Sequence, residues 1–186
     1  MLSEITPHLQ SVLQHASTDS YKIQPFAPKC IYSQFGSPSS AIVLEDLKVQ
    51  GFKMAERTMG LDMNHCSLVV RTLARYHATS AILYEENPEF FKNVQENLYS
   101  GKMKNNIDGF FGNSLRNLVQ EIKNWPDFDD RFRIKLENMC EFVVDHVIEI
   151  NQKHDGDFNV LTHGDLWLNN MMFRYSESTG EVQEIR

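Results

Sequence analysis

The chain has 186 residues, of which 41% are hydrophobic and 23% charged, which argues against global low-complexity disorder. A formal net charge of −7 argues against a binder of duplex nucleic acid, which needs a basic face to meet phosphates. No apolar stretch approaches the roughly 20 residues of a membrane span, and the N-terminal residues do not resemble a signal peptide.

The N-terminal part predicts a short helix followed by a β-hairpin. Residues 2–14 place apolar side chains at helical spacing, and Ser3 can cap the helix. Residues 29–35 and 41–45 predict two strands, because residues 36–40 (GSPSS) between them are typical of a turn. One short helix and one hairpin cannot form a stable domain alone, so this part must pack against later segments of the chain.

The middle of the chain predicts three helices. Apolar residues recur every three or four positions over residues 64–85, 109–124 and 129–152. The second of these helices must end near Pro126, because the residue before a proline is pushed out of the helical region. Asp129 favours the start of the third through the helix dipole.

The C-terminal part predicts small β elements around one loop. Residues 158–161 read as a short strand, 162–170 as a loop, 171–175 as a strand, 176–180 as a turn and 181–186 as a final strand. The element order predicts a mixed α/β (α+β) fold with a largely helical centre.

The three cysteines, Cys30, Cys66 and Cys140, are far apart and show neither CxxC pairs nor zinc-ligand spacing. They are expected to be reduced thiols, which favours a reducing compartment. We therefore expect a soluble, cytoplasmic protein.

The loop at residues 162–170 carries the candidate chemistry. A short apolar run ends in His163-Gly164-Asp165, and Asn170 follows five positions after the aspartate. Phosphoryl transfer needs such a pair, because a carboxylate orients the attacking hydroxyl and an amide oxygen helps to hold Mg²⁺. From the spacing alone, an ordinary loop rich in Asp and Asn explains the pair equally well.

Three segments carry a resemblance to the ecdysteroid-kinase-like (CHK kinase-like) family, within the choline/aminoglycoside phosphotransferase group. They are IVLEDLKVQGFKMAERTMGLD (42–62), LARYHATSAIL (73–83) and LTHGDLWLNNMMF (161–173). The loop is similar to the kinase catalytic loop H-R-D-x-x-x-x-N, with glycine in place of arginine. The tryptophan in HGDLWLNN and the LEDL–GF pair are specific to this branch, and the resemblance covers nearly the whole chain.

The resemblance implies a protein-kinase-like fold with a partial N-lobe at 1–46 and a mostly helical C-lobe at 47–186. It places the catalytic loop at 161–173. The implied function is ATP-dependent phosphorylation of a hydroxyl on a small molecule, with ATP and Mg²⁺ as cofactors. The family name suggests an ecdysteroid or similar alcohol, and other small alcohols stay open.

The resemblance also implies roles within the catalytic loop. Asp165 resembles the catalytic aspartate, and Asn170 resembles the Mg²⁺ ligand. His163 resembles the structural histidine that packs and hydrogen-bonds behind the aspartate, and Gly164 lets the backbone turn. Trp167 either stacks on a substrate or anchors the loop in the core.

Two further sites are implied nearer the N-terminus. Glu45, Asp46 and Leu47 resemble the hinge, where backbone groups meet the adenine of ATP. Glu4 is similar in position to the glutamate that pairs with the phosphate-gripping lysine. The same residues also have plainer explanations, because Glu45 and Asp46 can simply end a strand and Glu4 suits the first turn of any helix.

The chain looks truncated at both ends relative to this family. The glycine-rich loop and the lysine-bearing strand would precede Glu4, and the second metal-binding aspartate would follow the final strand. Whether this reflects an isoform, a fragment or an incomplete gene model stays open. We expect little phosphotransferase activity from these residues alone, and the alternative is a catalytically inactive kinase-like protein with a binding or regulatory role. We also expect an exposed sheet edge that is prone to association.

Overall fold

The computed structural model describes residues 4–16, 23–92, 99–152 and 156–186. The chain divides into two compact units, one formed by Met1–Asn93 with Phe158–Arg186 and the other by Val94–Asp157. Helices and small antiparallel sheets occur together, as expected for an α+β chain. Among these residues, no helix combines the length and the apolar character needed to cross a membrane.

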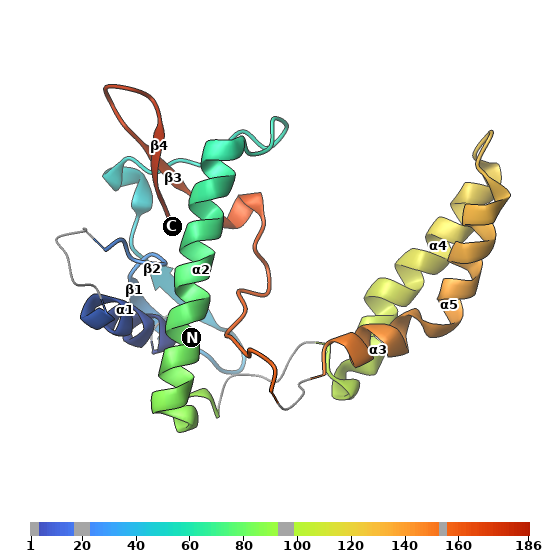
Figure 1. Cartoon of the computed structure of the whole chain (residues 1–186), viewed down its shortest axis with the longest axis horizontal. Helices are drawn as coiled ribbons and strands as arrows, with labels where there is room; N and C mark the ends of the chain where they lie inside the picture. Colours follow the sequence, from blue (N-terminus) through green and yellow to red (C-terminus); the bar gives the residue numbers. More distant parts are fainter. Residues whose placement is uncertain (1–3, 17–22, 93–98, 153–155) are drawn as a thin grey trace. The chain divides into compact units, whose positions relative to one another are not determined.

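In its described residues, the first unit contains one long helix, one shorter helix and two β-hairpins (Figure 1). Its helices and strands are α1 (Ile5–Ala16), β1 (Cys30–Gln34), β2 (Ala41–Leu44), α2 (Met63–Glu86), β3 (Phe173–Tyr175) and β4 (Val182–Ile185). Three short helices complete it: η1 (Leu47–Gln50), η2 (Pro88–Phe91) and η6 (Leu168–Asn170). The predicted hairpin and the helix at 64–85 are confirmed, while the expected cap Ser3 lies outside the described residues.

Helix α1 packs against α2 through its apolar side chains. Ile5 and Leu9 are buried, and Leu9 is fully inaccessible to solvent. The N-terminus of α2 is capped by Asp62, whose carboxylate accepts a hydrogen bond from the backbone N–H of His65 at 2.9 Å. Such a cap satisfies a backbone donor that has no partner within the helix.

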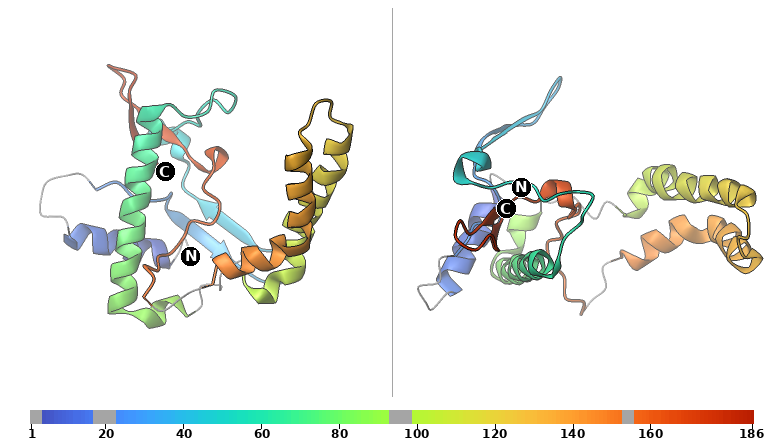
Figure 2. Two further views of the ribbon diagram at one scale, coloured as in Figure 1. Left: turned by 45° about the vertical axis from the view of Figure 1, so that its right-hand side comes forward. Right: turned by 90° about the horizontal axis from the view of Figure 1, so that it is seen from above.

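Strands β1 and β2 pair in antiparallel register, with Ser33 opposite Ile42. All four side chains of β2 are exposed, and seen from above the hairpin extends away from α1 and α2 (Figure 2). Asp46 then caps η1 by accepting a hydrogen bond from Lys48 N–H at 2.9 Å. Gly51 ends η1 with φ +82°, a left-handed conformation that favours glycine.

The core of the first unit lies around the second hairpin. Phe173 on β3 faces Ile185 on β4, and both are buried with Met171. Lys53 extends this sheet, because its backbone N–H and C=O pair with those of Phe173 at 2.9 and 2.8 Å. The segment after η1 therefore lies directly beside the strand that comes after the 162–170 loop.

A buried cluster of charged side chains lies on the other face of this hairpin. Glu184 accepts from the guanidinium groups of Arg174 and Arg186, and Arg186 also donates to the side chain of Gln24 at 3.1 Å. The two guanidinium groups lie over the ring of Phe52. Pairing keeps the buried charge of Glu184 satisfied, which an isolated carboxylate at this depth would not be.

The second unit consists of helices with their own buried apolar side chains. In chain order it contains η3 (Gly101–Met103), α3 (Lys104–Ile107), the π-helical segment η4 (Asp108–Gly112), α4 (Asn113–Glu121), η5 (Ile122–Asn124) and α5 (Asp130–Ile150). Helices α4 and α5 lie side by side (Figure 1), and Val119 and Ile122 are buried. The predicted helix at 109–124 is present with a π-helical start and a 3₁₀ end, and it stops before Pro126 as expected.

Candidate active site

The segment that leads into the candidate loop is held by helix α2 rather than by a strand. The predicted strand at 158–161 is wrong, because these residues join neither of the sheets in the described part of the chain. Instead, the backbone N–H of Leu161 donates a hydrogen bond to the Ser80 hydroxyl on α2 at 3.0 Å. In the apolar run that suggested a strand, the Leu161 N–H is thus bonded to a side chain and not to a neighbouring strand.

Gly164 turns the chain immediately before Asp165. Its φ of +82° lies in the left-handed region, where a side chain would be strained. After the turn, Asp165 N–H donates to Nδ1 of His163 at 3.3 Å, and Asp165 C=O accepts from Trp167 N–H at 3.1 Å. The His163 ring is exposed, and its contact with the aspartate is the hydrogen bond that it accepts from the backbone N–H.

Asn170 is held against Asp165 by two hydrogen bonds from one nitrogen. Its Nδ2 donates to the Asp165 carboxylate Oδ2 at 2.8 Å and to the Asp165 carbonyl at 3.0 Å. Helix η6 makes this possible, because it brings Asn170 N–H onto the Trp167 carbonyl at 2.9 Å and so curls the chain back. Both acceptors are oxygens without a proton, so the amide nitrogen faces the aspartate and the amide oxygen faces away.

Oxygen atoms of this kind fit a hard divalent cation. Mg²⁺ is usually bound by one or two carboxylate or amide oxygens together with substrate phosphates. Asn170 Oδ1 and the Asp165 carboxylate are such oxygens. The two side chains are joined by the hydrogen bond from Asn170 Nδ2, and both residues are exposed. Within the described ranges, no group of three or more His, Cys, Asp or Glu could hold a metal ion by itself. A Mg²⁺ ion bound here would take further oxygen ligands from substrate phosphates and water.

Trp167 sits between these two residues and is about half exposed. The residue is 44% exposed, and its ring lies beneath the Arg57 guanidinium, whose centre is 5.7 Å from the ring centroid. A cation over an indole face is attracted by the ring quadrupole. The contact joins the segment after η1 to the loop, while leaving part of the indole open to solvent.

The predicted hinge residues are bound into the local structure by their side chains. Glu45 accepts from Lys29 N–H at 2.8 Å and from the Gln50 side chain at 3.0 Å. Its own N–H donates to the Lys29 carbonyl at 3.0 Å. Asp46 caps η1, and Leu47 is buried.

Glu4 lies apart from the loop. It is exposed in the turn before α1, and its carbonyl accepts from His8 Nδ1 at 2.7 Å. Within the described residues, no hydrogen bond or ion pair joins Glu4 to residues 161–173. The structure therefore brings together His163, Asp165, Trp167 and Asn170, and it places Glu4 elsewhere.

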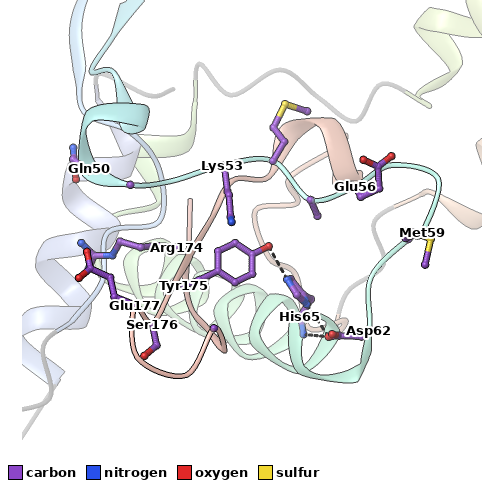
Figure 3. A pocket seen from close by; sticks show the side chains of 15 residues that line it. Gln50, Lys53, Glu56, Met59, Asp62, His65, Arg174, Tyr175, Ser176 and Glu177 are labelled. Carbon is purple, nitrogen blue, oxygen red and sulfur yellow. Dashed lines mark hydrogen bonds and ion pairs between the residues drawn. The ribbon is translucent and has the colours of Figure 1, made fainter.

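An open pocket of about 1000 Å³ lies beside this hairpin, lined by the segment after η1, the start of α2 and the β3–β4 turn (Figure 3). In it, His65 Nδ1 donates to Asp62 at 2.7 Å, and the Tyr175 hydroxyl lies 3.0 Å from His65 Nε2. Burial raises the pKa of Tyr175, and the negative charge of Asp62 adds to the rise. Lys53 Nζ lies over the Tyr175 ring at 4.6 Å. Sequence reasoning missed the His65–Tyr175 pair, which spans 110 positions, although an Asp three residues before a His is a recognisable cap.

The comparisons with known proteins give a family but no individual relative. A search of curated proteins and a search of solved structures found no match. The model of the ecdysteroid kinase-like family matches residues 1–186, which is the whole chain. The motifs at 42–62, 73–83 and 161–173 all lie within the matched residues. The chain therefore belongs to the ecdysteroid kinase-like family.

Proposed function

We propose that the chain carries the acceptor-activating loop of an ATP-dependent kinase that phosphorylates a hydroxyl group on a small molecule. The observation that supports this best is the 2.8 Å hydrogen bond between Asn170 Nδ2 and Asp165 Oδ2. It holds together a carboxylate that can take the hydroxyl proton and an amide oxygen that can bind Mg²⁺. Membership of a kinase-type family supports the same class of reaction.

In this proposal Asp165 orients the acceptor hydroxyl and accepts its proton. Its carboxylate is exposed, so an acceptor can reach it, and the bond from Asn170 occupies only one of its two oxygens. When bound, MgATP supplies the phosphoryl group, and the Mg²⁺ neutralises negative charge on the phosphates. Asn170 would hold the metal, and backbone groups of Glu45, Asp46 and Leu47 would meet the adenine. Glu4 would pair with a phosphate-binding lysine.

The surface beside Asp165 favours an apolar acceptor such as an ecdysteroid. Leu166 and Trp167 follow the aspartate directly and are 40% and 44% exposed. Large apolar side chains that stay open next to a reactive carboxylate can cover the hydrocarbon part of a steroid alcohol. The proposed acceptor is therefore an ecdysteroid or another largely apolar alcohol.

A second candidate is a catalytically inactive, kinase-like binding protein. The same hydrogen bonds favour it, because Asp165 and Asn170 satisfy each other through them with no other group required. The two candidates differ in one property. An enzyme forms phosphorylated product, whereas the binding protein would at most retain the nucleotide.

The test compares the chain with Asp165→Asn. The purified protein is incubated with MgATP and a panel of ecdysteroids and simpler alcohols, and phosphorylated product is measured by ³¹P NMR and mass spectrometry. The asparagine keeps an oxygen acceptor for Asn170 but cannot take a proton, so we expect a roughly 10²- to 10⁴-fold loss of turnover. Glu181→Gln, an exposed carboxylate in the β3–β4 turn, serves as the matched control.

Three outcomes separate the candidates. Product from the wild type that is lost only in Asp165→Asn supports the kinase. MgATP binding by calorimetry without any product assigns the second candidate. Equal turnover by the wild type and Asp165→Asn would overturn the role given to Asp165.

A further inference from the structure

Helix α2 carries a buried hydroxyl that contacts the segment leading to Asp165. The Ser80 side chain is 1% exposed, and its Oγ donates to the His77 carbonyl at 2.8 Å. The same oxygen accepts from Leu161 N–H at 3.0 Å. One hydroxyl thus uses both its donor and an acceptor position, with one partner on its own helix and the other 81 residues away.

The contact matters because, in the described part of the chain, this segment has no sheet to fix it. A backbone N–H shielded from water needs a partner, and at Leu161, which is partly buried, the partner is the Ser80 hydroxyl rather than a neighbouring strand. Leu161 stands four residues before Asp165, and Gly164 with its left-handed φ lies between them. A glycine adopts many conformations, so the direction of the turn must be set by contacts outside it.

The same helix holds the far end of the loop. Tyr175 follows Asn170 by five residues, and its hydroxyl lies 3.0 Å from Nε2 of His65, near the start of α2 (Figure 3). The region that carries Asp165 and Asn170 is therefore attached to one rigid helix on both sides. Of the two attachments, Ser80 lies closer in sequence to the aspartate and is the more deeply buried.

We propose that Ser80 is a positioning residue for Asp165, which fixes the entry to the catalytic loop by accepting the Leu161 N–H. The catalytic part of this inference rests on the proposed kinase function. The structural part, that loss of the hydroxyl loosens the chain from Leu161 to Asp165, stands without it.

The neighbouring Thr79 provides a matched control. It is also buried, at 3% exposed, and its hydroxyl also bonds carbonyls of its own helix, those of Arg75 and Tyr76, at 2.8 and 3.0 Å. Its two hydrogen-bond partners thus lie on α2 and not in the 161–173 segment. Thr79→Val therefore removes a buried α2 hydroxyl without touching the loop, whereas Ser80→Ala removes the hydroxyl that holds Leu161. Ser80→Thr keeps a hydroxyl and tests for rescue.

The first readout is amide hydrogen exchange, resolved by NMR, of Leu161 and Asp165 in these variants. Loss of one hydrogen bond should speed exchange at Leu161 by about tenfold in Ser80→Ala, with a smaller increase at Asp165. Thr79→Val should leave both amides as in the wild type, and Ser80→Thr should restore the protection. The proposal is overturned if Ser80→Ala leaves Leu161 protected, if only Leu161 changes and Asp165 does not, or if Thr79→Val has the same effect.

The second readout is turnover, which separates this proposal from the function it rests on. If Ser80 positions Asp165, Ser80→Ala should lower kcat by about 10- to 100-fold with little change in KM, because the carboxylate is displaced while binding is kept. An unchanged kcat beside faster exchange would overturn the catalytic part. If the wild type itself forms no product, the proposed function fails, and the exchange data still decide whether Ser80 holds the loop.

Discussion

Asn170 bonds Asp165 through one end of its amide. Nδ2 bonds both the carboxylate and the carbonyl of Asp165, so the amide oxygen is turned outward by the geometry of its own loop. An aspartate at this position would lose the donor and set two carboxylates against each other. Like charges so close together are unfavourable unless a proton or a cation lies between them.

This arrangement gives a prediction for Asn170→Asp. Without divalent cations the variant should be less stable than the wild type by about 1 kcal/mol, because an exposed hydrogen bond is lost and a repulsion is added. Millimolar Mg²⁺ should recover that loss in the variant more than in the wild type. Urea unfolding followed by Trp167 fluorescence, in a Trp125→Phe background, measures both effects.

Asn169→Asp is the control for this experiment, since it adds the same charge one position earlier, outside the pair of hydrogen bonds that joins Asn170 to Asp165. If Asn169→Asp and Asn170→Asp respond identically to Mg²⁺, the effect is one of net charge, and the outward-facing oxygen of Asn170 has no special role.

Helix α2 is the element on which the first unit depends. It contacts α1 on one side, carries the cap Asp62 at its start, and holds the 161–175 segment through His65 and Ser80. It also carries Tyr76, which is partly buried and whose ring meets Phe26 edge-on at 5.6 Å. Burial raises the pKa of Tyr76 to about 12.

The raised pKa predicts how stability changes at alkaline pH. Between about pH 10 and pH 12 the folded chain keeps the Tyr76 proton while the unfolded chain loses it. The stabilisation from the partly buried neutral phenol is therefore complete below pH 10 and is lost as pH rises through the folded-state pKa. Tyr76→Phe should lose less stability than the wild type across this window, as measured by urea midpoints at each pH.

Tyr32→Phe is the matched control, because Tyr32 lies 51% exposed on β1. A Tyr32→Phe curve that flattens as much as that of Tyr76→Phe would show that alkaline unfolding does not depend on the phenol buried against Phe26.

Much of the element plan could be predicted from the sequence. The apolar spacing of three and four residues located α2 and α5 to within one or two residues, because an amphipathic helix records its buried face locally. The short apolar run at 158–161 gave a wrong strand prediction, because strand formation depends on residues outside the run. A strand needs a neighbour, and nothing in residues 158–161 reveals that the partner of Leu161 is a serine hydroxyl on a distant helix.

In the candidate site too, local features could be predicted from the sequence and long-range contacts could not. The five-residue interval from Asp165 to Asn170 is visible in the sequence, and the structure joins the two side chains directly. The attachments at Ser80, His65 and Arg57 come from segments about 80 to 110 residues away, and no local pattern encodes such pairings.

At the scale of the whole molecule, the two compact units each contain one tryptophan. Trp167 belongs to the first unit and Trp125 to the second. Each unit also has a fully buried apolar side chain, Phe173 in the first and Ile122 in the second. Fluorescence can therefore report on each core separately.

We predict that the two cores unfold as separate transitions. Phe173→Ala should destabilise the first unit by about 3–5 kcal/mol, because a large buried ring leaves a cavity. The effect should appear when Trp167 is the reporter, in a Trp125→Phe background, and not when Trp125 is the reporter, in a Trp167→Phe background. Ile122→Ala should give the opposite pattern. A shift of equal size at both tryptophans would instead mean that the chain unfolds as one cooperative unit.

The attachment of one segment at two points along α2 has a consequence for chain length. His65 and Ser80 are fifteen residues apart, which in a helix corresponds to about 22 Å along the axis. Leu161 and Tyr175 are fourteen residues apart, and an extended chain of that length would reach about 46–50 Å. About half of the contour is therefore slack, taken up by the turn at Gly164 and the curl of η6. Deletions in this segment would shorten the spare length and pull Asp165 away from Asn170, whereas an added residue could be accommodated by a wider loop.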